Sequence, residues 1–172
     1  MRASVPYLCE RDEAMPTTGS ADILFVDDNP FDVDLTMRSL RACNAGDRVQ
    51  IARDGKEALD YIFGSGSYQG RKLEDGPRLV LLDLKLPKVT GLQVLQWIRA
   101  DPRTKELPVV ILTSFEDDRE VVEIFRLGVT GYLVKPLNKD EFCTLARKVG
   151  LEYVPAPKQE KVQPPSNRGS AP

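Results

Sequence analysis

Five short apolar runs, separated by stretches with helical periodicity, constrain the fold of this chain more than any other feature. The runs cover residues 23–26, 49–52, 79–82, 109–112 and 132–134. Their lengths suit buried strands, and the 79–82 run has no polar position, as expected of a strand that helices cover on both faces. Strands that alternate with helices predict an α/β fold with a parallel sheet and helices on both faces.

The stretches between the runs carry helix start and stop signals. Pro30 suits the first turn of a helix, Asn138 suits an N-cap, and Gly128 suits the end of a helix. The glycine-rich stretch 64–77 predicts a surface loop. We expect helices over about 30–42, 56–63, up to Ala100, from Asp117 or Asp118 to Leu127, and from Asn138 to about Val149.

One domain accounts for most of the chain. With 172 residues, 41% of them hydrophobic, the chain is long enough for a single core. We expect a folded domain over 21–150, a flexible extension over 1–20, and a disordered tail over 151–172 that is rich in Pro, Lys and Gln. The stretch after residue 150 is too short for a DNA-binding or catalytic output domain, which favours a stand-alone module.

Charge and apolar patterning exclude some partners and indicate a compartment. The formal net charge is -2 without a basic block, so nothing favours nucleic-acid binding. No apolar run approaches about 18 residues, and the N-terminus lacks a signal-peptide core, so we expect a cytoplasmic protein with no membrane span. The cysteines Cys9, Cys43 and Cys143 are far apart, and we expect thiols rather than a disulfide framework or a zinc site.

Polar side chains follow four of the five apolar runs. Asp27 and Asp28 follow the first, Asp83 the third, Thr113 the fourth and Lys135 the fifth. Because the carboxyl ends of parallel strands meet at one sheet edge, these groups should share a crevice. Each alone could be a helix cap, a buried strand end or a turn residue. Together, and with two adjacent like charges that favour a cation between them, they predict a site that binds a divalent cation and accepts a phosphoryl group.

The stretches ILFVDDNP, LVLLDLKLPKVTG, VVILTS and GYLVKP resemble the receiver domains of two-component response regulators, over about residues 21–150. The resemblance implies a flavodoxin-like, doubly wound sheet of five parallel strands in the order 2-1-3-4-5. It also implies that a sensor histidine kinase transfers a phosphoryl group from its phosphohistidine to an aspartate. The chain contains no histidine, so the donor must be another molecule.

The resemblance assigns a role to each strand-end residue. Asp83 is the implied phosphoacceptor, and Lys135 is implied to pair with the phosphoryl oxygens. Mg²⁺ is the implied cofactor, held directly by Asp28, through water by Asp27, by Asp83 itself and by the backbone carbonyl of Lys85. The family also implies a cis peptide bond between Lys135 and the proline that follows it.

The same resemblance implies a switch. The Thr113 hydroxyl would move onto a phosphoryl oxygen, and Tyr132 would turn inward into the space it leaves, although plain core filling is the alternative for Tyr132. Ser114 is small enough to leave the pocket open to a donor. The signal would leave through a surface of helix four, strand five and helix five, which we expect to form a homodimer. Val122 and Phe125 are either exposed on that surface or partly buried under strand five.

The partner and the output stay open at this point. The 64–77 loop and the LGVTGYLVKP run are similar to regulators of phytochrome-type kinases, which makes a bacteriophytochrome a candidate partner. A phosphate sink with no downstream partner and a scaffold that is not phosphorylated are two alternatives. An aspartate-nucleophile phosphatase is a third, but it needs a general acid two residues after Asp83, where this chain has Lys85.

Overall fold

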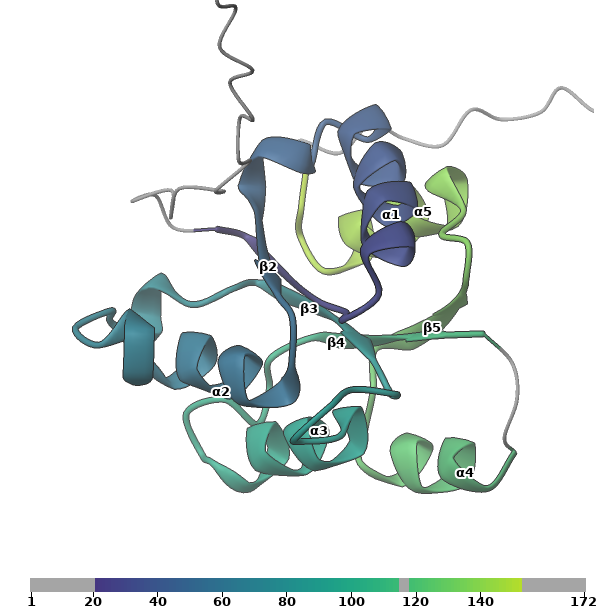
Figure 1. The fold of residues 1–172 in the computed structure, drawn as a ribbon. Helices are drawn as coiled ribbons and strands as arrows, with labels where there is room; N and C mark the ends of the chain where they lie inside the picture. The colour runs from purple at the N-terminus through teal and green to yellow at the C-terminus, as the bar shows by residue number, and fades with distance from the viewer. Residues whose placement is uncertain (1–20, 115–117, 153–172) are drawn as a thin grey trace, which may run out of the picture.

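The fold is described by a computed structural model, which covers residues 21–114 and 118–152, with side chains of the helix after the gap described from residue 122. Five strands form one parallel sheet in the order β2-β1-β3-β4-β5, which confirms the predicted topology. Figure 1 shows the sheet edge-on, between two layers of helices. The strands are β1 (Ile23–Val26), β2 (Val49–Ala52), β3 (Leu79–Asp83), β4 (Val109–Thr113) and β5 (Gly131–Val134).

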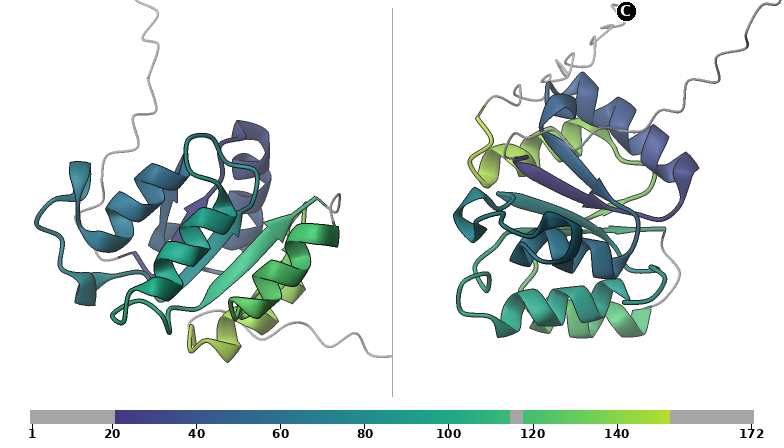
Figure 2. Two further views of the ribbon diagram at one scale, coloured as in Figure 1. Left: turned by 90° about the horizontal axis from the view of Figure 1, so that it is seen from below. Right: turned by 60° about the vertical axis from the view of Figure 1, so that its left-hand side comes forward.

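Helices cover both faces of the sheet, as expected for a doubly wound fold (Figures 1 and 2). One layer consists of α1 (Pro30–Ala42) and α5 (Lys139–Lys148). The other consists of α2 (Gly55–Phe63), α3 (Gly91–Ala100) and α4 (Asp118–Arg126). The expected surface loop over 64–77 contains two short 3₁₀ turns, Gly66–Tyr68 and Leu73–Asp75, and a third turn, Gly46–Arg48, precedes β2.

The core has two halves, one on each face of the sheet. Along β3, Leu79 and Leu81 pack on the α1/α5 side, while Val80 and Leu82 pack on the other side, and all four are fully buried. This explains why the 79–82 run has no polar residue: strand side chains alternate between the two faces of the sheet, and helices cover both faces. Leu151 is also buried in the α1/α5 half, and its backbone N–H donates to the Ala146 carbonyl.

Side-chain caps fix the helix starts near the strand ends. The Asn29 carboxamide accepts from the Phe31 backbone N–H at the start of α1. Thr90 and Gln93 form a capping box at the start of α3, and Asn138 caps α5. These caps accept hydrogen bonds from backbone N–H groups that the first turn of a helix leaves unpaired. The caps therefore determine the residue at which each helix begins.

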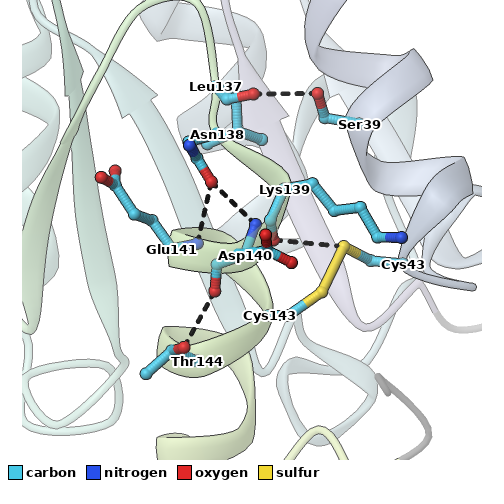
Figure 3. Close-up of a disulfide and its surroundings, with 9 residues drawn as sticks. All are labelled: Ser39, Cys43, Leu137, Asn138, Lys139, Asp140, Glu141, Cys143 and Thr144. Carbon is cyan, nitrogen blue, oxygen red and sulfur yellow. Dashed lines mark hydrogen bonds between the residues drawn. A yellow bond between two sulfur atoms is a disulfide. The ribbon is translucent and has the colours of Figure 1, made fainter. Parts of the chain in front are cut away.

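Cys43 and Cys143 form a disulfide, so the prediction of free thiols was wrong for these two residues (Figure 3). Cys43 is the C-cap of α1 and Cys143 lies in α5, with 6.3 Å between their Cα atoms and both residues buried. They are 100 residues apart in sequence, and only the side-by-side packing of α1 and α5 brings them together. Spacing along the chain therefore could not reveal the pair.

Some expectations concern residues outside those the structure describes. The flexible extension over 1–20, Cys9, and all but the first two residues of the predicted tail belong to this group, as does the capping role of Asp117. Within the described part of the chain, none of the helices is long and apolar enough to cross a membrane.

Candidate functional site

The sheet brings the predicted polar residues to one edge. Asp27 directly follows β1, Asp83 ends β3, and Thr113 ends β4. The register pairs Val26 with Leu82, and Thr113 with the last residue of β5, which Lys135 follows. The carboxyl ends of four neighbouring strands therefore finish at nearly the same level, which is what places their polar residues together.

The Lys135 ammonium lies between carboxylates. Its Nζ donates to Asp27 Oδ2 at 2.7 Å, to Asp83 Oδ2 at 2.9 Å, and to Asp32 Oδ2 at 2.9 Å. The Lys135 side chain is 11% exposed, so little water competes for these bonds. The peptide bond between Lys135 and Pro136 is cis, as the resemblance implied.

Burial and charge oppose each other at Asp27. Its side chain is fully buried, and burial raises its pKa, whereas the hydrogen bonds from Lys135 and from the Asn29 backbone N–H act to lower it. Burial also works against the charge of Lys135, but hydrogen bonds to Asp27, Asp83 and Asp32 outweigh it and raise the pKa of Lys135. Lys135 is thus a permanent cation at neutral pH, held by its carboxylate partners.

Three carboxylates can hold a cation at this edge. Asp27, Asp28 and Asp83 each offer an oxygen atom, and these atoms all lie within 4.8 Å of one another. Asp28 is exposed, so the group opens to solvent on one side. Hard oxygen donors, few in number and open to water, fit Mg²⁺, which retains waters and prefers carboxylates.

The loop after β3 packs closely against Asp83. The Lys85 backbone N–H donates to Asp83 Oδ1 at 3.2 Å, and the Lys85 side chain is exposed. Gly91 begins α3 with its N–H on the Leu84 carbonyl, and a side chain at Gly91 would collide with the Asp83 carbonyl oxygen. Glycine is therefore required at position 91 for α3 to start beside the carboxylate.

The predicted switch residues lie beside the carboxylates, toward α4. Thr113 is partly buried and Ser114 is exposed. Thr113 continues the side-chain alternation of Ile111, which packs on the α4 side of the sheet, and Tyr132 pairs with Ile111 across the ladder. Tyr132 is 50% exposed, and its ring meets the Phe125 ring edge-to-face at 5.8 Å between centroids. Tyr132 is therefore not core filling in this structure.

The structure decides between exposure and partial burial for Val122 and Phe125 of α4. Val122 and Phe125 are both more than half exposed, so the structure has the exposed arrangement rather than burial under β5. Together with Tyr132 they form an apolar surface, here called the α4–β5 surface, over helix α4 and the edge strand β5.

Sequence reasoning missed one member of the site. Asp32 lies in the first turn of α1 and binds Lys135 as Asp27 and Asp83 do. The prediction considered only residues at strand ends, and Asp32 lies beyond the helix start. A usable signal was present: an acidic residue in the first turn of a helix that begins directly after Asp27 and Asp28 projects from the same sheet edge.

The fold and the site together define a receiver-type α/β protein, with a carboxylate cluster and a lysine at the carboxyl edge of a sheet in the order β2-β1-β3-β4-β5. A family model described as "Response regulator receiver domain" matches residues 23–147. The chain belongs to the response regulator receiver domain family.

Several known regulators are similar to this chain in sequence or in structure. The chain is 41% identical to the probable methanogenesis regulatory protein FilR2 of Methanothrix harundinacea over 69% of this chain and 74% of that protein. It is 36% identical to the response regulator Rcp1 of Synechocystis sp. over 70% of this chain and 80% of Rcp1. The solved bacteriophytochrome response regulator AtBRR superposes with a TM-score of 0.66 at 41% identity, covering 80% of this chain and 96% of AtBRR.

One solved structure bears on the metal. It is described as the Mn²⁺-bound form of Rcp1, and it matches with a TM-score of 0.63 at 33% identity, covering 78% of this chain and 98% of that one. A divalent cation in that relative agrees with the oxygen-rich group of Asp27, Asp28 and Asp83 found here.

Proposed function

We propose that this protein is a stand-alone response regulator that accepts a phosphoryl group on Asp83 from a partner histidine kinase. The observation that carries the proposal is the position of the Lys135 ammonium, 2.9 Å from Asp83 Oδ2, beside two further aspartates that can hold a cation. A carboxylate is a competent nucleophile when nearby positive charge offsets the repulsion between it and the incoming phosphoryl oxygens.

In the proposed reaction an Asp83 oxygen attacks phosphorus, and the bond between phosphorus and the imidazole nitrogen of the kinase breaks. Lys135 pairs with the phosphoryl oxygens, and the Thr113 hydroxyl donates to one of them. Ser114, small and exposed, leaves room for the donor. The protein itself acts as a phosphoacceptor, with at most slow self-phosphorylation and self-dephosphorylation.

The donor set fits Mg²⁺, with Asp28 as a direct ligand, Asp27 through water, and Asp83 and the Lys85 carbonyl completing the protein ligands. When bound, the cation supplies charge neutralisation between Asp83 and the phosphoryl group. Among the described residues, the cluster of Asp27, Asp28 and Asp83 is the one whose oxygens converge closely enough for this role.

The output is a change of surface contacts. Once Asp83 is phosphorylated, Thr113 moves toward it and Tyr132 turns inward, which alters the α4–β5 surface together with α5. The exposure of Val122, Phe125 and Tyr132 supports this surface as the place where a homodimer forms. A regulator without a downstream partner, serving as a phosphate sink, has the same site and differs only in lacking this output.

The names of the relatives support a phytochrome-type kinase as the partner, and the cytoplasm is the compartment that we propose. AtBRR is described as a bacteriophytochrome response regulator, and a second match, RcpA, as a phosphorylated cyanobacterial phytochrome response regulator. The Cys43–Cys143 disulfide removes the support that widely spaced thiols gave to a reducing compartment. We assign the receiver domain to residues 21–150.

Intact-mass measurement after incubation with acetyl phosphate and Mg²⁺ tests the proposal. The wild-type protein should gain one phosphoryl group, Asp83→Asn should gain none, and Asp34→Asn should behave as the wild type. Asp34 is a suitable control because it carries the same charge but pairs with Arg38 on the exposed face of α1. An unmodified wild-type protein, or an undiminished adduct in Asp83→Asn, would overturn the proposal.

A further inference from the structure

The third partner of Lys135 is outside the cation-binding group. Asp27 and Asp83 belong both to the carboxylate cluster and to the Lys135 hydrogen bonds, whereas Asp32 belongs only to the latter. Its carboxylate oxygen lies 2.9 Å from Lys135 Nζ, and its side chain is 31% exposed. Asp32 thus contacts the ammonium from the α1 side and is not one of the three clustered carboxylates, Asp27, Asp28 and Asp83, that can hold a cation.

Cation binding creates a problem for Lys135. A divalent cation at the cluster would draw on oxygens of Asp27 and Asp83, which now accept from the ammonium. It would also repel the ammonium, because both carry positive charge at short range in a site with little water. With only these two carboxylates as partners, Lys135 would lose its hydrogen bonds when the cation binds. Its ammonium would then leave the site before it could pair with the phosphoryl oxygens.

Asp32 is well placed to prevent that loss. Its backbone lies in the first turn of α1, whose start is fixed by the Asn29 cap, and a carboxylate there is favoured by the helix dipole. The far end of α1 is joined to α5 by the disulfide, and Ser39 of α1 donates to the Leu137 carbonyl, two residues after Lys135 (Figure 3). The distance between Asp32 and Lys135 is therefore set by a braced pair of segments.

We propose that Asp32 is a positioning residue: it retains the Lys135 ammonium in the site when a cation occupies the other carboxylates, so that Lys135 stays within reach of the phosphoryl oxygens on Asp83. The inference rests on the proposed function for its last step. Its first step, retention of Lys135 beside a bound cation, concerns this chain alone and can be measured without a phosphodonor.

The test compares Asp32→Asn with Asp34→Asn, its neighbour on α1, which carries the same charge change but pairs with Arg38 at the surface. In full-length protein labelled with ¹⁵N-lysine, the Lys135 ammonium signal should persist on addition of Mg²⁺ in the wild type and in Asp34→Asn. In Asp32→Asn it should broaden or vanish, because released ammonium protons exchange rapidly with water.

Kinetics give the second readout. Phosphorylation by acetyl phosphate should slow about tenfold in Asp32→Asn, because small errors in positioning cost up to about a hundredfold. The Mg²⁺ dissociation constant should change less than about threefold, as expected for a partly solvated charge outside the cluster. Asp32→Glu keeps the charge and should restore part of the rate.

Several outcomes would overturn the inference. An unchanged rate in Asp32→Asn would do so, and so would a loss of rate matched by an equal loss of Mg²⁺ affinity, because Asp32 would then act as a ligand. If the wild-type protein accepts no phosphoryl group, the proposed function fails by itself. A Lys135 signal that persists in Asp32→Asn with Mg²⁺ would sink the retention step independently.

Discussion

Helices α5 and α4 both flank the edge strand β5, but they are fastened to the molecule in different ways. Helix α5 is joined to α1 by the Cys43–Cys143 disulfide, and Leu137, just before the N-cap of α5, accepts from Ser39 of α1 through its carbonyl. Helix α4 is bound to α3 by polar contacts: Gln96 donates to Glu123, and Arg99 donates to the Leu127 and Gly128 carbonyls just after α4. Among the described α4 side chains, residues 122–126, Ile124 is the buried one.

This difference separates two tasks. The α5 side carries Lys135 into the site, and its bracing keeps the ammonium in register with the carboxylates. The α4 side presents Val122, Phe125 and the neighbouring Tyr132 to solvent, with little buried surface to resist displacement. We therefore expect phosphorylation to move α4 and Tyr132 more than α5.

Removing the disulfide should have the largest effect on stability. Cys143→Ala should lose about 4 kcal/mol, since the bridge closes a loop of 100 residues and constrains the unfolded chain. Urea unfolding without reductant measures the loss, and Cys9→Ser serves as the control that leaves the bridge intact. A thiol count of three in the denatured, unreduced wild type, or equal stability of both variants, would contradict the bracing of α5.

Removing the Lys135 charge should be the next largest effect. Lys135→Met leaves the fully buried Asp27 without its cation and should cost about 3 kcal/mol at neutral pH. The exposed Lys105→Met is the matched control. Both proteins are compared by urea unfolding in the absence of divalent cations.

The pH dependence of that loss has a definite sign. Burial already raises the pKa of Asp27, and removal of Lys135 takes away the main opposing hydrogen bond, so the pKa rises further. A group with a raised pKa in the folded state contributes stability below its unfolded value of 3.8, and loses it as the pH rises through the folded value. The deficit of Lys135→Met should therefore shrink as the pH falls from about 8 to about 4. A deficit independent of pH would exclude Asp27 as its source.

The carboxylate site and the contacts of α1 show what the sequence could and could not predict. The strand order was available from the sequence only through the family resemblance. The convergence of Asp27, Asp83 and Lys135 was predictable because it follows from strand ends in a parallel sheet. The disulfide and the Asp32 contact depend on how α1 is rotated and how closely it packs on α5. Periodicity along the chain specifies which face of a helix is apolar, but it does not specify which residues of two helices meet.

Loosening the C-terminal end of α4 should cost less. Arg99→Met leaves the Leu127, Gly128 and Leu107 carbonyls without their guanidinium donor and should destabilise by about 2 kcal/mol. Hydrogen exchange should accelerate in α4 and remain unchanged in α5. Arg103→Met is the control, because its pairing with Asp101 is at the surface. Equal acceleration in both helices would show that α4 and α5 are not fastened independently.

The smallest effect on stability should occur on the α4–β5 surface, where the effect on association should be large. Phe125→Ala removes an edge-to-face contact with Tyr132, but both residues are about half exposed, so the loss of stability should be about 0.5 kcal/mol. If this surface forms the phosphorylation-dependent homodimer, the dissociation constant of that dimer should rise at least about tenfold, since truncation of a central aromatic anchor commonly costs more than 1 kcal/mol.

Trp97→Ala is the matched control for Phe125→Ala, because Trp97 is an exposed aromatic residue on α3, outside the α4–β5 surface. Sedimentation with acetyl phosphate and Mg²⁺ measures the association of both variants. Loss of association in Trp97→Ala with retention in Phe125→Ala would move the interface to α3. It would also remove the main functional reason for α4 to be held more loosely than α5. Loss of association in Phe125→Ala with retention in Trp97→Ala would instead link α4 to signalling. The exposure that makes Phe125 dispensable for folding also leaves its side chain free to contact a partner.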